Sequence, residues 1–231
     1  MLIGGLQKFS VLDYPGHISA IIFTKGCNFK CQFCYNPMLV YPSKKDHTLI
    51  LENDLFYFLK KRIGKLDSVV ITGGEPTVQQ DLPKFIQKIK KLNYLVKLDT
   101  NGTNPEMLKN LIQKNLINYI AMDIKAPLEK YNQITGVEVD FNKIQKSIKI
   151  IMQSNLPYEF RTTVVPKFLD AEDIKKIGEL IQGAKKWFLQ NFKSNTDLVN
   201  KKLENKSAFL NKKMKEMCEV GKLYVRQCGL R

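Results

Sequence analysis

Short apolar runs alternate along the chain with longer segments in which apolar residues recur every three or four positions. A short β-branched or aromatic run is typical of a strand, whereas the longer period is typical of an amphipathic helix. The short runs predict strands at residues 17–23, 68–72, 95–99, 119–124, 158–165 and 187–190, and a less regular run suggests another at 223–226.

The periodic segments predict helices, and several of them begin with residues that favour a helix N-terminus. Asn104 precedes Pro105, which suits an N-cap followed by proline at the first helical position. Asp170 is a second candidate N-cap, and Pro83 fits within a first helical turn. The predicted helices cover residues 54–65, 81–92, the segment after 104, 141–155 and 170–183.

Strands that alternate with helices of this length form βαβ units with parallel strands and right-handed crossovers. The predicted fold class is therefore α/β with a parallel sheet. No repeat, low-complexity linker or domain boundary is visible, so residues 1–231 are expected to form one domain. Its core is expected at about residues 15–192, followed by a basic extension at 193–231.

Cys27, Cys31 and Cys34 follow the first predicted strand, on a loop that opens at Gly26. Three thiolates can hold three irons of a [4Fe–4S] cluster, since a fully closed site takes a fourth cysteine. The fourth iron would then stay open, as one position does in a catalytic zinc site. The alternative is a zinc site that borrows a fourth ligand from Cys218, Cys228 or His17.

A second chemical motif ends the strand predicted at 68–72, where Gly73-Gly74-Glu75-Pro76 follows a β-branched run. The glycines allow a ligand to approach the backbone closely, and the Glu75 carboxylate can accept a hydrogen bond from an ammonium group. Two further polar motifs follow later strands: Asp99-Thr100-Asn101-Gly102 and Asp123-Ile124-Lys125. Because catalytic residues of such folds gather at the carboxyl ends of the strands, these motifs are expected on one rim.

The net charge, the apolar content and the cysteines limit the functional classes to which the chain can belong. The net charge is +15, but the lysines are spread along the chain, so nucleic-acid binding is not expected. The densest basic stretch, residues 193–222, is expected to be a solvated terminal helix or a helix that docks a partner. No run of 18 apolar residues exists, so no membrane span is expected. Three of five cysteines lie together, which favours metal binding in a reducing, cytoplasmic compartment.

The motifs resemble those of the radical S-adenosylmethionine (SAM) superfamily. The resemblance rests on Cys27-x-x-x-Cys31-x-Phe33-Cys34 and on Gly73-Gly74-Glu75-Pro76. Within the superfamily the chain is similar to glycyl-radical-enzyme activases, and most of all to those of anaerobic ribonucleoside-triphosphate reductase. That similarity rests on Gly4–Ser10, Leu12–Gly16, Thr24–Phe29, Asp99–Gly102 and Met122–Pro127. The implied fold is a single-domain open βα barrel of about six parallel strands.

The resemblance also implies roles for individual residues. A [4Fe–4S] cluster on the three cysteines would bind SAM, whose amine would contact Glu75 and the backbone of Gly73 and Gly74. Phe33 would lie against the adenine or simply pack under the loop, and Lys125 and Arg161 would hold the SAM carboxylate. Asp99 and Asn101 are further candidates for cofactor binding. Asp99, Thr100 and Asp123 offer hard oxygens that suit a monovalent cation, or Asp99 and Asp123 merely cap turns.

The implied reaction is reductive cleavage of SAM, followed by abstraction of a glycine Cα hydrogen from a partner enzyme. Flavodoxin or ferredoxin would supply the electron, and anaerobic ribonucleoside-triphosphate reductase or pyruvate formate-lyase would be the partner. A radical SAM enzyme that modifies a small molecule or nucleobase, and a non-enzymatic metal module, are the alternatives. The chain departs from the activases at Tyr35, where they commonly carry histidine after the third cysteine.

Overall fold

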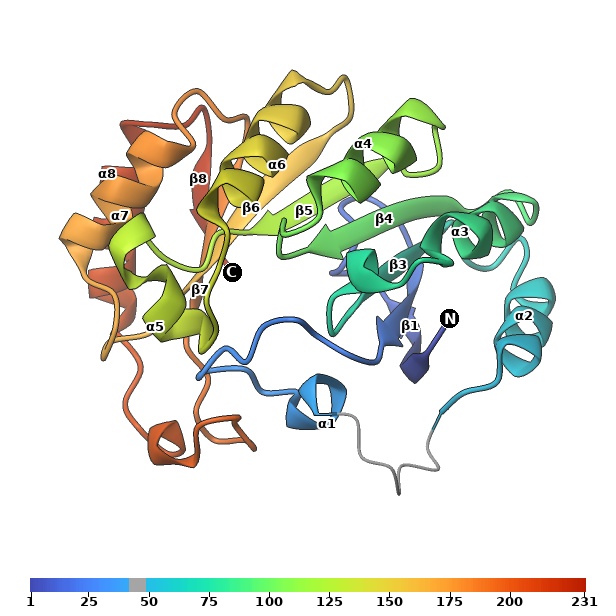
Figure 1. The fold of residues 1–231 in the computed structure, drawn as a ribbon, viewed down its shortest axis with the longest axis horizontal. Helices are drawn as coiled ribbons and strands as arrows, with labels where there is room; N and C mark the ends of the chain where they lie inside the picture. The colour runs from blue at the N-terminus through green and yellow to red at the C-terminus, as the bar shows by residue number, and fades with distance from the viewer. Residues whose placement is uncertain (42–48) are drawn as a thin grey trace. The chain divides into compact units, whose positions relative to one another are not determined.

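The computed structural model describes residues 1–41 and 49–231 (Figure 1). Contacts between Cα atoms divide these residues into two compact units. The first unit comprises Met1–Asn28, Met38–Thr100 and Asn104–Ile120, and the second comprises Phe29–Pro37, Asn101–Thr103 and Ala121–Arg231. Whether residues 1–231 form one domain stays a prediction.

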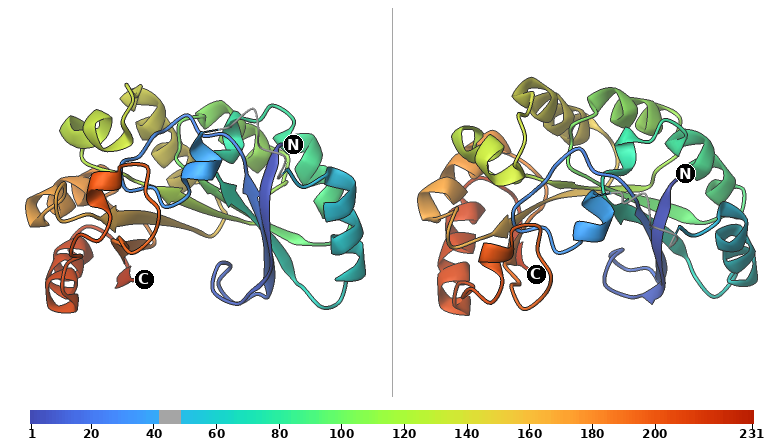
Figure 2. Two further views of the ribbon diagram at one scale, coloured as in Figure 1. Left: turned by 90° about the horizontal axis from the view of Figure 1, so that it is seen from below. Right: turned by 60° about the horizontal axis from the view of Figure 1, so that its bottom comes forward.

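Strands β1 to β4 lie side by side in the first unit, in chain order. Their bounds are β1 (Ile3–Ser10), β2 (Ser19–Thr24), β3 (Ser68–Gly73) and β4 (Leu95–Thr100). β2 pairs with β3 and β3 with β4 in parallel, whereas β1 pairs antiparallel with β2. The sequence did not predict β1, because its two glycines and polar middle break the apolar alternation of a strand. Figure 2 shows the β1–β2 loop at the far end of these strands from the N-terminus.

Helices of the first unit bury the apolar stripe that the sequence predicts. They are α2 (Glu52–Lys61), α3 (Leu82–Lys90) and α4 (Pro105–Gln113), accompanied by the short helices α1 (Pro37–Val40) and η1 (Pro76–Val78). The predicted Asn104 cap is confirmed, since its side-chain oxygen accepts a hydrogen bond from the Met107 N–H at 3.1 Å. Pro83 also lies within the first turn of α3.

β5 (Tyr119–Asp123) carries the chain from the first unit into the second. The second unit continues with η2 (Leu128–Lys130), α5 (Tyr131–Thr135), α6 (Phe141–Gln153), β6 (Tyr158–Val164), α7 (Ala171–Leu180), β7 (Trp187–Asn191), η3 (Lys201–Leu203), α8 (Asn211–Lys222) and β8 (Cys228–Leu230). β6 pairs with β7 and β7 with β8, both in parallel. The predicted Asp170 cap is confirmed as a capping box with Asp173. Together with the first unit, this order confirms the α/β class.

The C-terminal segment differs from its prediction in two respects. Residues 193–222 were expected to form a helix, but the structure has the short helix η3 and then α8, which begins only at Asn211. The strand suggested at 223–226 is wrong: this stretch is the turn that follows α8, and the strand β8 begins at Cys228. α8 lies beside α7 (Figure 2) and buries Met214 and Met217, so the lysine-rich helix packs through an apolar stripe. No helix in the described part of the chain combines the length and apolar character needed to span a bilayer.

Candidate functional site

None of the three predicted metal ligands, Cys27, Cys31 and Cys34, is in a disulfide, and they belong to different units. Cys27 belongs to the first unit and is partly buried. Cys31, which is buried, and the partly buried Cys34 belong to the second unit, where the Cys34 N–H donates to the Cys31 carbonyl at 3.0 Å. Gly26, at which the cysteine loop was expected to open, has a φ of +95°, a conformation that favours glycine.

Segments distant in sequence anchor the loop that carries Cys31 and Cys34. On one side, the Lys30 and Gln32 N–H groups donate to the carbonyls of Thr135 and Ile134 at 2.8 and 3.1 Å. On the other, the Val199 N–H donates to the Cys34 carbonyl at 3.0 Å and the Asn200 N–H to the Gln32 carbonyl at 3.0 Å. The Asn200 side chain also donates to Gln32 Oε1 at 2.6 Å. We name Val199, Asn200 and Gln32 the loop clamp; sequence analysis missed it.

The charges near Cys31 bear on its ability to bind iron. Burial raises the pKa of the Cys31 thiol to about 11, although the nearby Lys125 ammonium opposes that rise. Iron binds the thiolate, so coordination has to displace this proton. The described residues hold no group of three or more His, Cys, Asp or Glu side chains around one point. A cubane does not require one, because each cysteine binds a different iron. Three cysteines in this spacing, none of them in a disulfide, fit such a cluster.

The Gly73-Gly74 pair has a packing role that the sequence did not reveal. A Cβ at Gly74 would overlap the Gly26 carbonyl, and a Cβ at Gly73 would overlap the Thr24 backbone. The Gly74 N–H donates to the Thr24 carbonyl at 2.8 Å and the Glu75 N–H to the Gly26 carbonyl at 2.9 Å. The Gly-Gly-Glu turn is therefore tied to the segment that leads into Cys27.

Glu75 is buried, and its carboxylate is held by hydroxyl and amide groups of the first unit. Its Oε1 accepts from the Thr77 N–H at 3.1 Å, from the Thr77 hydroxyl, and from the Thr100 hydroxyl at 2.7 Å. The Asn104 amide donates to the Thr77 carbonyl at 2.8 Å and so supports the same turn. These bonds fix the carboxylate at the end of β3, where the sequence places an acceptor for an ammonium group.

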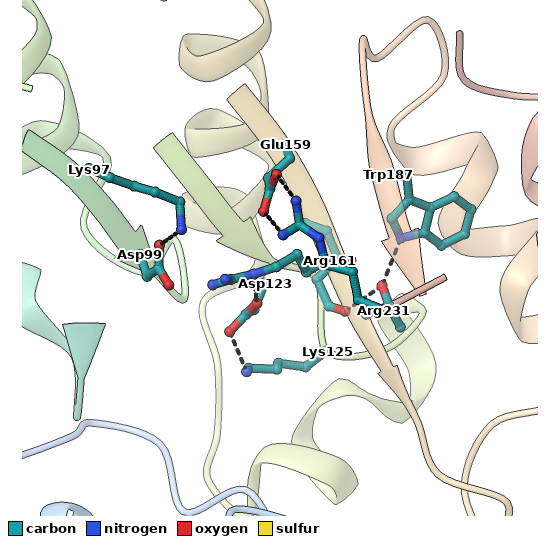
Figure 3. Close-up of polar contacts among 10 residues, drawn as sticks. Lys97, Asp99, Asp123, Lys125, Glu159, Arg161, Trp187 and Arg231 are labelled. Atoms are coloured by element: carbon teal, nitrogen blue, oxygen red, sulfur yellow. Dashed lines mark hydrogen bonds and ion pairs between the residues drawn. The ribbon is translucent and has the colours of Figure 1, made fainter. Parts of the chain in front are cut away.

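In the second unit, Asp123 forms ion pairs with both predicted cationic residues (Figure 3). Its Oδ2 lies 3.0 Å from Lys125 Nζ and its Oδ1 lies 3.0 Å from Arg161 Nε. Burial alone would raise the pKa of Asp123, but Arg161 and Lys125 outweigh it and lower the pKa to about 2. Burial disfavours the Lys125 ammonium, yet the charge of Asp123 raises its pKa overall. One carboxylate between two cations leaves this group with a net positive charge that suits an anion.

Aromatic side chains pack around the same cations. Phe33 is buried, and Lys125 Nζ lies 5.8 Å from its ring centroid. The Tyr131 hydroxyl accepts a hydrogen bond from the Lys125 N–H at 3.4 Å, and burial raises the pKa of Tyr131. Tyr35, which stands where the activases commonly have histidine, is 49% exposed. The packing role of Phe33 is thus visible, whereas its contact with adenine stays a prediction.

The residues predicted to bind a monovalent cation already have other partners. Asp99 Oδ1 lies 2.6 Å from Lys97 Nζ (Figure 3), Thr100 donates to Glu75, and Asp123 pairs with Lys125 and Arg161. In this arrangement the carboxylates do not fit an added cation, because each is paired with a cationic side chain. Asn101 Oδ1 accepts from the Thr103 N–H at 3.0 Å, so it shapes a turn, and its cofactor role stays a prediction.

Comparison with known proteins assigns the chain to a family. The model of the radical SAM superfamily matches residues 21–181, which include all three clustered cysteines and every other predicted site residue. The chain belongs to the radical SAM superfamily. Membership of this family implies a [4Fe–4S] cluster and SAM as the cofactors of this radical SAM enzyme.

Individual relatives differ in how much of the chain they match. One relative is a protein of Methanocaldococcus jannaschii that is named as a glycyl-radical enzyme activating enzyme. It is 33% identical to this chain, and the match covers 100% of this chain and 95% of the relative. A second relative is a protein of Saccharolobus islandicus that is named as a GTP 3′,8-cyclase. It is 30% identical to this chain, and the match covers 70% of this chain and 52% of the relative. Among solved structures, Streptococcus suis SuiB bound to the precursor peptide SuiA has a TM-score of 0.66 at 16% identity, covering 90% of this chain and 47% of SuiB. That likeness, together with the family match, confirms the predicted radical SAM type of α/β fold.

Proposed function

We propose that this radical SAM enzyme is an activase, which abstracts a glycine Cα hydrogen from a partner enzyme and leaves a glycyl radical. The observation that carries the proposal is the match, over the whole chain, to a relative with the name of a glycyl-radical enzyme activating enzyme. The cyclase relative matches only part of each chain. The partner we propose is anaerobic ribonucleoside-triphosphate reductase, with pyruvate formate-lyase as the alternative, and a flavodoxin or ferredoxin would donate the electron.

The cofactors would carry the difficult chemistry: with one electron from the reduced cluster, SAM would supply a 5′-deoxyadenosyl radical and release methionine. Cys27, Cys31 and Cys34 would hold three irons. The protein's own contribution is to bind, orient and exclude water, so that the glycine of the partner lies near C5′. No side chain has to move a proton for this reaction.

The described contacts support separate roles in SAM binding for the residues that would contact its ammonium, its carboxylate and its adenine. Glu75, fixed by Thr77 and Thr100, would accept hydrogen bonds from the SAM ammonium, together with the Gly73-Gly74 backbone. Lys125 and Arg161 would hold the SAM carboxylate, since their shared pairing with Asp123 orients both cations. Phe33 would lie against the adenine, and Asp99 and Asn101 would contribute to the same cofactor site.

An anaerobic electron paramagnetic resonance experiment tests the proposal. The reconstituted enzyme is mixed with SAM, a strong one-electron reductant and anaerobic ribonucleoside-triphosphate reductase, and 5′-deoxyadenosine is assayed in the same tube. We expect a glycyl-type doublet that is absent from a Cys31→Ala control. Deoxyadenosine without the doublet would discard this partner and keep SAM cleavage. An intact cluster that gives neither signal would refute the activase assignment.

A further inference from the structure

Lys97 is a buried charged residue for which the proposed reaction has no assigned role. It lies in the middle of β4, and its side chain is only 1% exposed. The register between β3 and β4 pairs it with Val70, which belongs to an apolar cluster with Tyr14, Ile21 and Tyr119. Burying an ammonium among such side chains is costly unless a partner compensates the charge. A lysine at this position therefore needs a compensating negative charge close to its ammonium group.

Asp99 supplies the compensating charge. Residues 97 and 99 are two apart on one strand, so both side chains point to the same face. Lys97 Nζ lies 2.6 Å from Asp99 Oδ1, and Figure 3 shows the lysine stem extended along the strand toward that carboxylate. The ammonium also lies 5.9 Å from the centroid of the Tyr119 ring, on which a cation can be stabilised. Asp99 is itself only 12% exposed, so water screens the pair weakly.

The pair is adjacent to the candidate SAM residues of the first unit. Thr100 follows Asp99 and donates its hydroxyl to Glu75 at 2.7 Å. Carboxylate and hydroxyl oxygens at such a strand end are the ligands that an alkali cation prefers. Here a tethered ammonium carries the same single charge and already contacts the carboxylate. An uncompensated Asp99 would repel the carboxylate of a bound SAM, and Lys97 removes that repulsion.

We propose that Lys97 is a positioning residue that acts as a built-in monovalent cation, so that SAM binding by this enzyme requires neither sodium nor potassium. This inference rests on the proposed use of Asp99 and Glu75 in SAM binding. The Lys97 ammonium supplies the positive charge that a sodium or potassium ion would otherwise bring to the oxygens of Asp99 and Thr100. Lys97 itself touches neither cofactor nor substrate and acts through Asp99.

The test measures SAM binding directly, by equilibrium dialysis of labelled SAM against the anaerobically reconstituted enzyme. Choline chloride is compared with potassium or sodium chloride at equal ionic strength. Wild-type affinity is expected to be the same in all three salts. Lys97→Met keeps the length of the stem and removes the charge; in choline its affinity should fall at least about tenfold, equivalent to about 1.4 kcal/mol. Potassium or sodium should restore it.

Two variants control the interpretation. Lys90→Met removes a lysine of α3 that pairs with the neutral Asn118 side chain at 2.9 Å, and its SAM affinity should match the wild type in every salt. Lys97→Arg keeps the charge and should remain independent of sodium and potassium. If Lys97→Met does not fold, the salt dependence of SAM binding by the wild type and by Lys97→Arg tests the inference instead. The line width of the sodium NMR signal gives a second measurement. That line width should show no saturable sodium site on the wild-type enzyme.

The outcomes separate the inference from the proposed function. A wild-type enzyme that binds SAM only with sodium or potassium, or that shows a saturable sodium site, would overturn the role of Lys97 and leave the activase proposal intact. The same holds if Lys97→Met binds SAM in choline as tightly as the wild type. A wild-type enzyme with an intact cluster that binds no SAM in any salt would overturn the proposed SAM site, and the inference with it.

Discussion

Replacing Asp123 by asparagine should destabilise the protein, because the carboxylate is the shared partner of Lys125 and Arg161. A folded-state pKa of about 2, against an ordinary 3.8, means that the environment favours ionised Asp123 by about 2 kcal/mol. The asparagine amide keeps the shape of the side chain but leaves two partly buried cations without a counter-charge. We therefore expect a loss of at least about 2 kcal/mol in the free energy of unfolding, or roughly 4 to 8 °C in Tm for a chain of this size.

The assay is thermal unfolding of the anaerobic holoenzyme between pH 5 and 8. Because the pKa of Asp123 is lowered on folding, its contribution is complete above the unfolded pKa and is lost only as the pH falls from about 4 towards 2. The difference between wild type and variant should thus be constant over the measured range. Asp197→Asn is the matched control: its pair with Lys201 has the same 3.0 Å separation but is exposed and screened by water, so this variant should melt close to the wild-type temperature. Equal melting of Asp123→Asn and wild type would refute the reasoning.

Three further predictions concern the cysteine loop. Gly74→Ala should lower the iron content of reconstituted enzyme, because its Cβ would overlap the Gly26 carbonyl; iron content equal to wild type would contradict this. Asn200→Ala should destabilise the loop by about 1 kcal/mol through loss of its bond to Gln32, seen as faster iron release to a chelator, whereas unchanged release would discount the loop clamp. In iron-free protein, alkylation of Cys31 should be slow at pH 8, and its rate should rise about tenfold per pH unit towards the Cys31 pKa of about 11. Mass spectrometry of the alkylated peptide measures this rate. A rate that levels off near pH 9 would exclude that pKa.

Features encoded locally could be predicted from the sequence. The caps at Asn104 and Asp170 form because the side chain and the amides that it binds lie within three residues of one another. The turn at Gly73-Gly74 follows from the positive φ of Gly73, +112°, a conformation that glycine adopts far more readily than other residues. The radical SAM family could likewise be predicted, because its cysteine and glycine motifs are short and contiguous.

The partners of charged residues were harder to predict. Lys97 looks like an ordinary strand residue until its spacing to Asp99 is noted, and the same two-residue spacing links Asp123 to Lys125. Side chains at this spacing share one face of a strand, so the sequence did hold a signal for both ion pairs. Nothing in the sequence pairs Gln32 with Asn200, which lies 168 residues further along the chain.

That separation has a consequence for how the enzyme is made. The loop with Cys31 and Cys34 emerges early from the ribosome, but Asn200 emerges only after 168 more residues. At about 5–20 residues per second, roughly 10 to 30 s of translation separate the two events. The nascent loop lacks its clamp for all of that interval. Stable loading of iron and sulfide should therefore be a step performed on the finished polypeptide, and a ribosome stalled before codon 200 should display a chain that loses iron readily.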